Sequence, residues 1–359
     1  MTQATVPSAD CERIAQWCRE DWPLLRGGRI FLTGGTGFFG TWLLASFIHA
    51  NRVHALGAQI TVLTRDAARF RRRTPLLADD PAVRIWDGDV TSFTFPQERF
   101  THIIHAAAEA SAKLNTERPL EMIDTIVLGT RRTLELARHC GAKRFLFVSS
   151  GAIYGRQPPG LARMSEDAGG GPDPLNAQAA YGEAKRLAEQ MCAAVSRAQG
   201  LEVAIARCWA FVGPWLPLDA HFAAGNLIRD ALGGGPLVIL GDGTTERSYL
   251  YAADLAAWLW RILVRGASLR PYNVGSDEGV SIAALAALIA AAVEPTPLVE
   301  IRGQPRPGVP IDRYIPSVSR ARDELGLVPW TSLQEALKMT IAWHAPNDKV
   351  ADRQMGQGL

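Results

Sequence analysis

Short apolar runs, rich in β-branched and aromatic residues, alternate along most of the chain with longer amphipathic stretches. The apolar runs predict buried strands at residues 29–32, 59–63, 83–86, 102–106, 144–148 and 203–206. Helical spacing of apolar positions predicts helices at residues 41–50, 128–138 and 181–197. Strands that alternate with helices build a parallel sheet that is covered on both faces. The pattern therefore predicts a Rossmann-type, doubly wound α/β fold.

The two ends of the chain depart from this alternation. Residues 8–25 predict one amphipathic helix, and after Trp209 prolines and glycines separate shorter elements, which indicates a smaller C-terminal lobe. Ligand should bind between the lobes. We expect an N-terminal helical extension at 1–28, a dinucleotide-binding domain at 29–207 to which residues 248–275 return, a substrate-binding lobe made of 208–247 and 276–345, and a tail at 346–359.

Composition and charge narrow the choice of partner. The chain has 359 residues, and its 38 Lys and Arg residues nearly balance 36 Asp and Glu residues, which argues against nucleic acid or a membrane surface as a partner. No apolar run reaches the ~18 residues that a membrane-spanning helix needs, and the first residues lack a signal-peptide pattern. The five cysteines are widely spaced without a CxxC pair. We therefore expect a cytoplasmic protein with neither a disulfide framework nor a metal site.

A glycine-rich turn joins the strand predicted at 29–32 to the helix that follows it. Residues 33–40 read Thr-Gly-Gly-Thr-Gly-Phe-Phe-Gly. Glycines in such a turn let the chain reverse tightly, bring backbone N–H groups to a pyrophosphate and let the helix pack close to the sheet. We predict that Gly34, Gly37 and Gly40, with Phe38 and Phe39 between them, bind the pyrophosphate of a dinucleotide cofactor.

The end of the second predicted strand bears on the choice between NAD and NADP. An acidic side chain here would bind the adenosine ribose, but Thr64 occupies the expected position and Arg65 follows it. A guanidinium can clamp a 2′-phosphate, so Arg65 favours NADP, while NAD stays open because a surface arginine needs no such role. Asp89 and Val90, which follow the third strand, are expected near the adenine.

Tyr181 and Lys185 lie one helical turn apart at the start of a predicted helix, so both side chains face the same way. A phenol with a pKa of ~10 is a poor base at neutral pH, but a lysine and a nicotinamide charge nearby are expected to lower that pKa. Such a tyrosine can remove or return a carbinol proton while hydride moves to or from the cofactor. Ser150 follows a buried parallel strand, where α/β sheets present catalytic groups, and can bond the reacting oxygen.

Several motifs, in this order along the chain, resemble the extended short-chain dehydrogenase/reductase family, and within it the nucleotide-sugar epimerases and dehydratases. The resemblance covers about residues 29–342. The matching stretches are residues 33–40, 88–90, 105–108, 149–155, 181–185, 207–214, 241–256 and 306–308.

The resemblance implies an NAD(P)-dependent enzyme that acts on a nucleotide-diphosphate sugar. It implies Ser150, Tyr181 and Lys185 as the catalytic set, and Arg247 and Arg306 as contacts of the substrate diphosphate. It also implies a homodimer that packs through the helices predicted at 128–138 and 181–197. The cofactor contacts that it implies are the glycine turn, Ala106, Ala107, Ala108, Tyr181 and Lys185.

Some positions depart from the family pattern. The Asp-Glu pair that 4,6-dehydratases use for elimination is replaced by Gly151 and Ala152, neither of which transfers a proton. Elimination would have to recruit another group, such as Glu109 or His221, which with Gly151 we place among the substrate-binding residues. Asparagines common in the family are replaced by Ile126 and Ala210.

These departures rank the possible reactions. We predict a nucleotide-sugar epimerase that transiently oxidises a sugar carbinol to a keto sugar. The alternatives are a nucleotide-sugar 4-keto reductase, a 4,6-dehydratase and, more remotely, a non-catalytic NADP-binding scaffold of the same fold.

Overall fold

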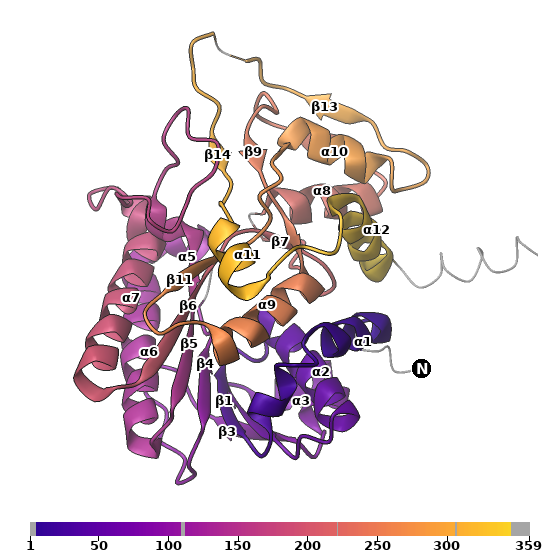
Figure 1. Cartoon of the computed structure of the whole chain (residues 1–359). Helices are drawn as coiled ribbons and strands as arrows, with labels where there is room; N and C mark the ends of the chain where they lie inside the picture. The colour runs from indigo at the N-terminus through magenta and orange to yellow at the C-terminus, as the bar shows by residue number, and fades with distance from the viewer. Residues whose placement is uncertain (1–4, 109–111, 221, 306, 346–359) are drawn as a thin grey trace, which may run out of the picture.

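Seven parallel strands form one sheet in the computed structural model, which describes residues 5–108, 112–220, 222–305 and 307–345 (Figure 1). The strand order is β11-β6-β5-β4-β1-β2-β3. This order confirms the predicted doubly wound sheet, and it reverses between β1 and β4, where such sheets open a ligand crevice at their carboxyl ends. The strands are β1 (Arg29–Thr33), β2 (Gln59–Thr64), β3 (Val83–Asp87), β4 (His102–His105), β5 (Arg144–Ser150), β6 (Glu202–Cys208) and β11 (Pro271–Val274).

The sheet is apolar on both faces, because alternate residues of each central strand enter separate cores. Ile30 and Leu32 of β1 pack in the core on the side of α2 and α9, whereas Phe31 packs on the side of α6 and α7 (Figure 1). These four helices are α2 (Phe38–Val53), α9 (Ala252–Arg265), α6 (Pro119–Cys140) and α7 (Ala180–Gln199). Shorter helices at the sheet are α3 (Ala67–Arg73), α4 (Pro75–Ala78), α5 (Ala112–Glu117), η2 (Gly151–Tyr154) and η3 (Ala177–Ala179).

The N-terminal extension packs against α2 and α9 as two short elements, α1 (Ser8–Trp17) and η1 (Trp22–Leu25). The prediction of one continuous helix over 8–25 is wrong, because the chain turns after Trp17. Asp21, which lies in this turn, is buried and forms ion pairs with Arg261 and Arg265 of α9. The turn thus ties the extension to the main body.

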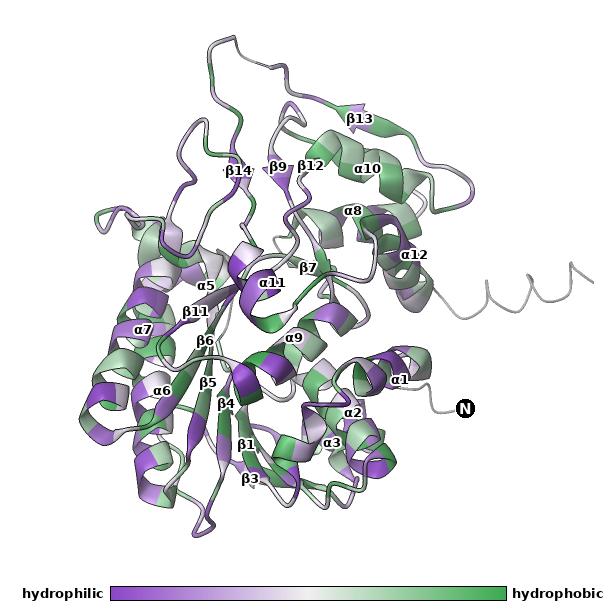
Figure 2. Ribbon diagram, in the orientation of Figure 1, coloured by the Kyte–Doolittle hydropathy of each residue, from purple (hydrophilic) through white to green (hydrophobic). Residues whose placement is uncertain are grey.

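The later part of the chain forms small sheets and short helices above the carboxyl edge of the large sheet (Figure 1). In Figure 2, α10 is largely hydrophobic, whereas β9 and β14 are hydrophilic. The strands are β7 (Phe211–Val212), β8 (Leu237–Ile239), β9 (Glu246–Arg247), β10 (Leu250–Tyr251), β12 (Val280–Ser281), β13 (Val299–Ile301) and β14 (Arg313–Tyr314). The helices are α8 (Ala223–Leu232), α10 (Ile282–Ala290), α11 (Ser319–Leu325) and α12 (Leu333–His344).

Within the described ranges, no helix is long and apolar enough to cross a membrane. The same residues contain no group of three or more His, Cys, Asp or Glu side chains arranged to hold a metal ion. All five cysteines are buried and free.

Candidate active site

The glycine turn closes tightly at the amino end of α2. Gly34 has a φ of +75°, and a Cβ there would lie 2.7 Å from the backbone of Ala106, while a Cβ at Gly40 would lie 2.3 Å from the Gly34 oxygen. A Cβ at Gly37 would meet only the Gly34 oxygen, at 3.5 Å. The helix begins at Phe38 rather than at the predicted residue 41. Its first amides lack intrahelical partners, so the residues present fit the pyrophosphate of NAD at this helix end.

The two phenylalanines of the turn are half-buried and pack with the core on the α2 side of the sheet. The ring of Phe39 contacts the edge of Phe211 at a centroid distance of 5.0 Å and that of Phe38 at 5.7 Å. Their rings therefore hold the turn in place, and only their backbone amides are suited to the predicted pyrophosphate contact.

Ala106, Ala107 and Ala108 follow β4 directly opposite the glycine turn. The Ala107 amide donates to Thr33 Oγ1 at 3.1 Å, and Thr33 Oγ1 lies 2.8 Å from His105 Nδ1. The other ring nitrogen, Nε2, lies 3.0 Å from Thr130 Oγ1, so a threonine hydroxyl faces each side of the imidazole. Burial lowers the pKa of His105 to about 3, so this imidazole is neutral. The sequence analysis missed this residue, which holds the 106–108 segment beside the glycine turn.

The residues predicted to bind the adenosine part of the cofactor lie where β2 and β3 end. Thr64 is buried, whereas the Arg65 side chain is 73% exposed and lies 4.0 Å from Asp89 Oδ2. Asp89 accepts hydrogen bonds from the Thr91 amide at 2.9 Å and from the Thr91 hydroxyl at 2.5 Å. Val90 is buried in the core on the α6 side. Arg65 is thus largely exposed, and its one ion pair within the described ranges is with Asp89, the acid predicted to lie near the adenine.

Ser150, Tyr181 and Lys185 come together at the carboxyl ends of β5 and β6. Ser150 is the last residue of β5, and its side chain is hydrogen-bonded to Tyr181 in the first turn of α7. Lys185, one turn further along α7, donates from Nζ to the Val148 carbonyl at 2.7 Å and lies 6.0 Å from the centre of the Tyr181 ring. The three residues predicted as the catalytic set therefore share one site.

Burial dominates the ionisation of this pair. It raises the pKa of Tyr181 to about 12, against the opposing effect of the hydrogen bond from Ser150. It lowers the pKa of Lys185 to about 8. The predicted lowering of this pKa combined Lys185 with the charge of a nicotinamide, and Lys185 alone does not offset the effect of burial. A phenolate at Tyr181 requires a further positive charge in the site.

The space above Gly151 is filled by two aromatic residues that the sequence analysis did not select. A Cβ at Gly151 would lie 2.6 Å from the hydroxyl of Tyr314 and 2.7 Å from Cδ2 of Trp209. The Tyr314 hydroxyl is also hydrogen-bonded to Ser150. No sequence motif marks Tyr314, because the pairing of β14 with β9 alone brings it to this place.

Two arginines are predicted to contact the substrate diphosphate, and the one within the described ranges, Arg247, lies in β9. Its guanidinium donates to Asp312 Oδ2 at 2.7 Å, and Arg156 lies 3.7 Å from the other oxygen of the same carboxylate. Glu109, His221 and Arg306 lie outside the described residues.

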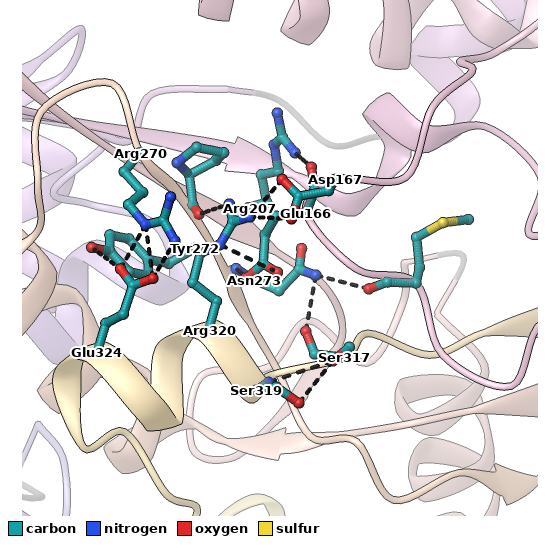
Figure 3. Close-up of polar contacts among 12 residues, drawn as sticks. Glu166, Asp167, Arg207, Arg270, Tyr272, Asn273, Ser317, Ser319, Arg320 and Glu324 are labelled. Carbon is teal, nitrogen blue, oxygen red and sulfur yellow. Dashed lines mark hydrogen bonds and ion pairs between the residues drawn. The ribbon is translucent and has the colours of Figure 1, made fainter.

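A largely buried network of hydrogen bonds and ion pairs lies beneath the site. Glu189, one turn after Lys185, accepts from Ser149 Oγ at 2.5 Å and pairs with Arg207 of β6 at 2.8 Å. Arg207 also donates to the Tyr154 hydroxyl, which donates to Asn273 Oδ1 at 2.9 Å. Figure 3 shows Arg207 and Asn273 with Glu166 at the centre of further contacts that reach Arg320 and Ser317. The network joins α7, β6 and β11 beneath Ser150, Tyr181 and Lys185.

Comparison with known proteins places the chain in a family. Residues 30–275 match the model of the NAD dependent epimerase/dehydratase family. The chain belongs to this family. UDP-glucuronic acid decarboxylase 6 of Arabidopsis thaliana is 30% identical over 87% of this chain and 87% of that protein. UDP-glucuronic acid decarboxylase 1 of Xenopus tropicalis is 30% identical over 87% of this chain and 71% of that protein.

A solved structure supports the same placement. The UDP-glucose 4-epimerase of Thermus thermophilus, crystallised with NAD, has a TM-score of 0.71 and 25% identity, with 88% of this chain and 98% of that chain covered. The protein is thus an NAD-dependent enzyme of the nucleotide-sugar epimerase, dehydratase and decarboxylase type, which confirms the predicted family, fold and cofactor class. Decarboxylation is a reaction that the sequence analysis did not consider.

Proposed function

We propose that the enzyme is a nucleotide-sugar epimerase in which Tyr181 takes the proton of a sugar hydroxyl and later returns it. One observation carries the proposal: Ser150 and Tyr181 share a hydrogen bond, and Lys185 lies one helical turn away. The three residues lie at the carboxyl edge of the sheet, the edge that also carries the glycine turn. This is the geometry that proton removal from a carbinol beside a dinucleotide requires.

The chain's own residues supply the proton transfer. NAD, held by the glycine turn, would supply the acceptor and later the donor of the hydride of the carbinol carbon. Ser150 orients the reacting oxygen, Tyr181 accepts its proton, and the Lys185 ammonium stabilises the resulting phenolate. When the keto sugar presents its other face, Tyr181 returns the proton to the oxygen and the inverted hydroxyl forms. No other acid takes part.

The surroundings of Ser150 favour this reaction over elimination. Gly151 and Ala152 carry no acid, and Tyr314 and Trp209 leave no room for a side chain at position 151. Elimination would therefore depend on Glu109 or His221. A 4-keto reductase uses the same three side chains and stays an alternative.

Arg247, with Arg306, is proposed to hold the substrate diphosphate, which requires the Arg247–Asp312 pair to open.

Decarboxylation is the second candidate, and the names of the relatives favour it. Oxidation of a uronic acid at C4 places a ketone β to the C6 carboxylate. Such a β-keto acid releases CO2 when the C5–C6 bond breaks, and C5 then takes a proton from solvent. Return of the hydride to C4 would complete the reaction, with CO2 as the net loss. The lack of an acid at positions 151 and 152 does not disfavour this step.

The mass of the product separates these reactions. Purified enzyme with NAD is incubated with UDP-, dTDP-, GDP- and CDP-glucose and with UDP-glucuronic acid, and the products are separated by chromatography, which resolves epimers, and analysed by mass spectrometry. We expect a new isomer of unchanged mass, and no product from Tyr181→Phe. Loss of water contradicts the proposed epimerase and favours a dehydratase. Loss of CO2 favours the decarboxylase, and a gain of two hydrogens with NADPH favours the reductase. A Tyr181→Phe variant that keeps full biological activity would favour the scaffold.

We also propose a cytoplasmic homodimer with the domain boundaries given above. Leu120 and Leu128 of α6 and Leu187 of α7 are 73%, 45% and 48% exposed, respectively, which suits a helical interface with a second copy. Light scattering should give a dimer for the wild type and a smaller species for Leu128→Glu. A wild-type monomer contradicts the proposed assembly.

A further inference from the structure

A second phenol lies in the reaction centre. The Tyr314 hydroxyl is hydrogen-bonded to Ser150, the same side chain that is hydrogen-bonded to Tyr181. Its oxygen stands 2.6 Å from the position of a Cβ on Gly151. The motif-based catalytic set of Ser150, Tyr181 and Lys185 leaves this residue without a role.

Tyr314 is held in place on several sides. Its ring packs on Trp209 at a centroid distance of 4.3 Å, and the indole N–H of Trp209 donates to Asn273 Oδ1 at 3.1 Å. The side-chain amide of Asn273 also donates to the Ser317 carbonyl at 3.0 Å (Figure 3). The amide of Ile315, the next residue, donates to Gln157 Oε1 at 3.0 Å. The phenol is therefore built into the site rather than placed on a free loop.

Tyr314 also lies between the two parts of the proposed substrate site. It pairs directly with Arg247 in the β14–β9 ladder, and the Arg247 guanidinium lies 5.9 Å from the centre of its ring. Its hydroxyl meets Ser150 at the other end. A sugar that links a diphosphate on Arg247 to a carbinol on Ser150 must therefore pass along Tyr314.

We propose that Tyr314 is a further catalytic residue, a fixed hydrogen-bond donor to the reacting sugar oxygen, while Tyr181 is the phenol that transfers the proton. This inference rests on the proposed function. Two phenols that share one serine do not both ionise readily, because the first negative charge opposes the second. Tyr181 has Lys185 beside it and ionises first, whereas Tyr314 keeps its proton and can donate a hydrogen bond to the keto oxygen.

The test removes one oxygen from each of two tyrosines. Tyr314→Phe keeps the ring on Trp209 and loses only the hydroxyl. Tyr272→Phe is the matched control, because the Tyr272 hydroxyl bonds Glu324 and the Ala267 amide, away from Ser150. Calorimetry with UDP, dTDP, GDP and CDP, and then with the matching nucleotide glucose, separates diphosphate binding from sugar binding.

We expect Tyr314→Phe to bind the nucleoside diphosphate like the wild type but the nucleotide sugar several-fold more weakly. Its kcat should fall by about tenfold to a hundredfold, the loss expected for one donor to a reacting oxygen, while Tyr272→Phe stays near the wild type. Unchanged kcat and sugar affinity overturn the inference, and so does loss of diphosphate affinity, which would mark a structural role. If the wild type binds none of the four nucleotides, the proposed function itself fails.

Discussion

Alanine at two glycines of the same turn should affect different properties, mainly stability at Gly40 and mainly NAD binding at Gly37. At Gly40, a Cβ would lie 2.3 Å from the Gly34 oxygen and 2.3 Å from Gly35 Cα, and both of these atoms belong to the backbone. At Gly37, the nearest atom to a Cβ would be the Gly34 oxygen at 3.5 Å, and the φ of −88° is accessible to alanine. The first substitution should therefore lower the stability of the fold clearly, and the second should lower it only slightly.

The magnitudes follow from these contacts. Overpacking against backbone at Gly40 should cost about 3 kcal/mol, offset by about 1 kcal/mol from the helix propensity of alanine. The net loss in the free energy of unfolding is therefore about 2 kcal/mol. Gly37→Ala should cost less, about 0.5–1 kcal/mol, as the loss of a favourable helix N-cap residue. Its methyl group would instead stand where the pyrophosphate approaches the Phe38–Gly40 amides, so NAD should bind about tenfold more weakly, a loss of about 1.4 kcal/mol.

Urea denaturation and calorimetric titration with NAD measure the two effects separately. Gly40→Ala should unfold at a clearly lower urea concentration than Gly37→Ala. In Gly37→Ala, the loss of free energy of NAD binding should exceed the loss of free energy of unfolding. Wild-type NAD affinity in Gly37→Ala, or wild-type stability in Gly40→Ala, refutes the assignment of the turn.

Three further predictions address other parts of the molecule. Because the pKa of Lys185 falls from its ordinary 10.5 to about 8 in the folded chain, the unfolded chain binds the extra proton between these values. The free energy of unfolding of the wild type, relative to Lys185→Met, should therefore rise from pH 8 to pH 10.5, and a flat difference contradicts the burial of the ammonium. Asp21→Asn should lower the free energy of unfolding by about 3 kcal/mol, because it breaks a buried ion pair. Glu20→Gln, at a side chain that is 73% exposed, should change it by less than about 0.5 kcal/mol. Equal effects of the two substitutions in urea denaturation would contradict the docking of the extension. Arg65→Ala should weaken NADP binding by about tenfold and leave NAD binding unchanged, and equal losses for both cofactors remove the proposed contact with a 2′-phosphate.

The central sheet was predictable because its signals are local. Strands such as Ile30–Leu32 are apolar throughout, and the glycines and the Tyr181–Lys185 spacing are contained in short stretches. Helix ends were less predictable: α2 begins inside the glycine motif at Phe38, and the chain turns between Trp17 and Trp22 although helical spacing of apolar residues continues across the turn.

The rest of the candidate site depends on contacts between distant segments. Tyr314 reaches Ser150 only because β14 pairs with β9, and His105 is recognisable as a neutral support only when Thr33 and Thr130 are seen on its two nitrogens. The pKa of Tyr181 likewise depends on how deeply the phenol is buried, which the spacing to Lys185 does not contain. Sequence patterns thus selected the residues that we propose as the catalytic set, and tertiary packing determined their environment.

Turnover in D2O, followed by proton NMR of the product, tests the proposed chemistry most directly. Hydride that leaves the carbinol carbon and returns to it does not exchange with solvent, so we predict an epimer that carries no deuterium at any ring carbon and is not formed by Tyr181→Phe. Deuterium at C5, with loss of water or of CO2, would contradict epimerisation by transient oxidation alone.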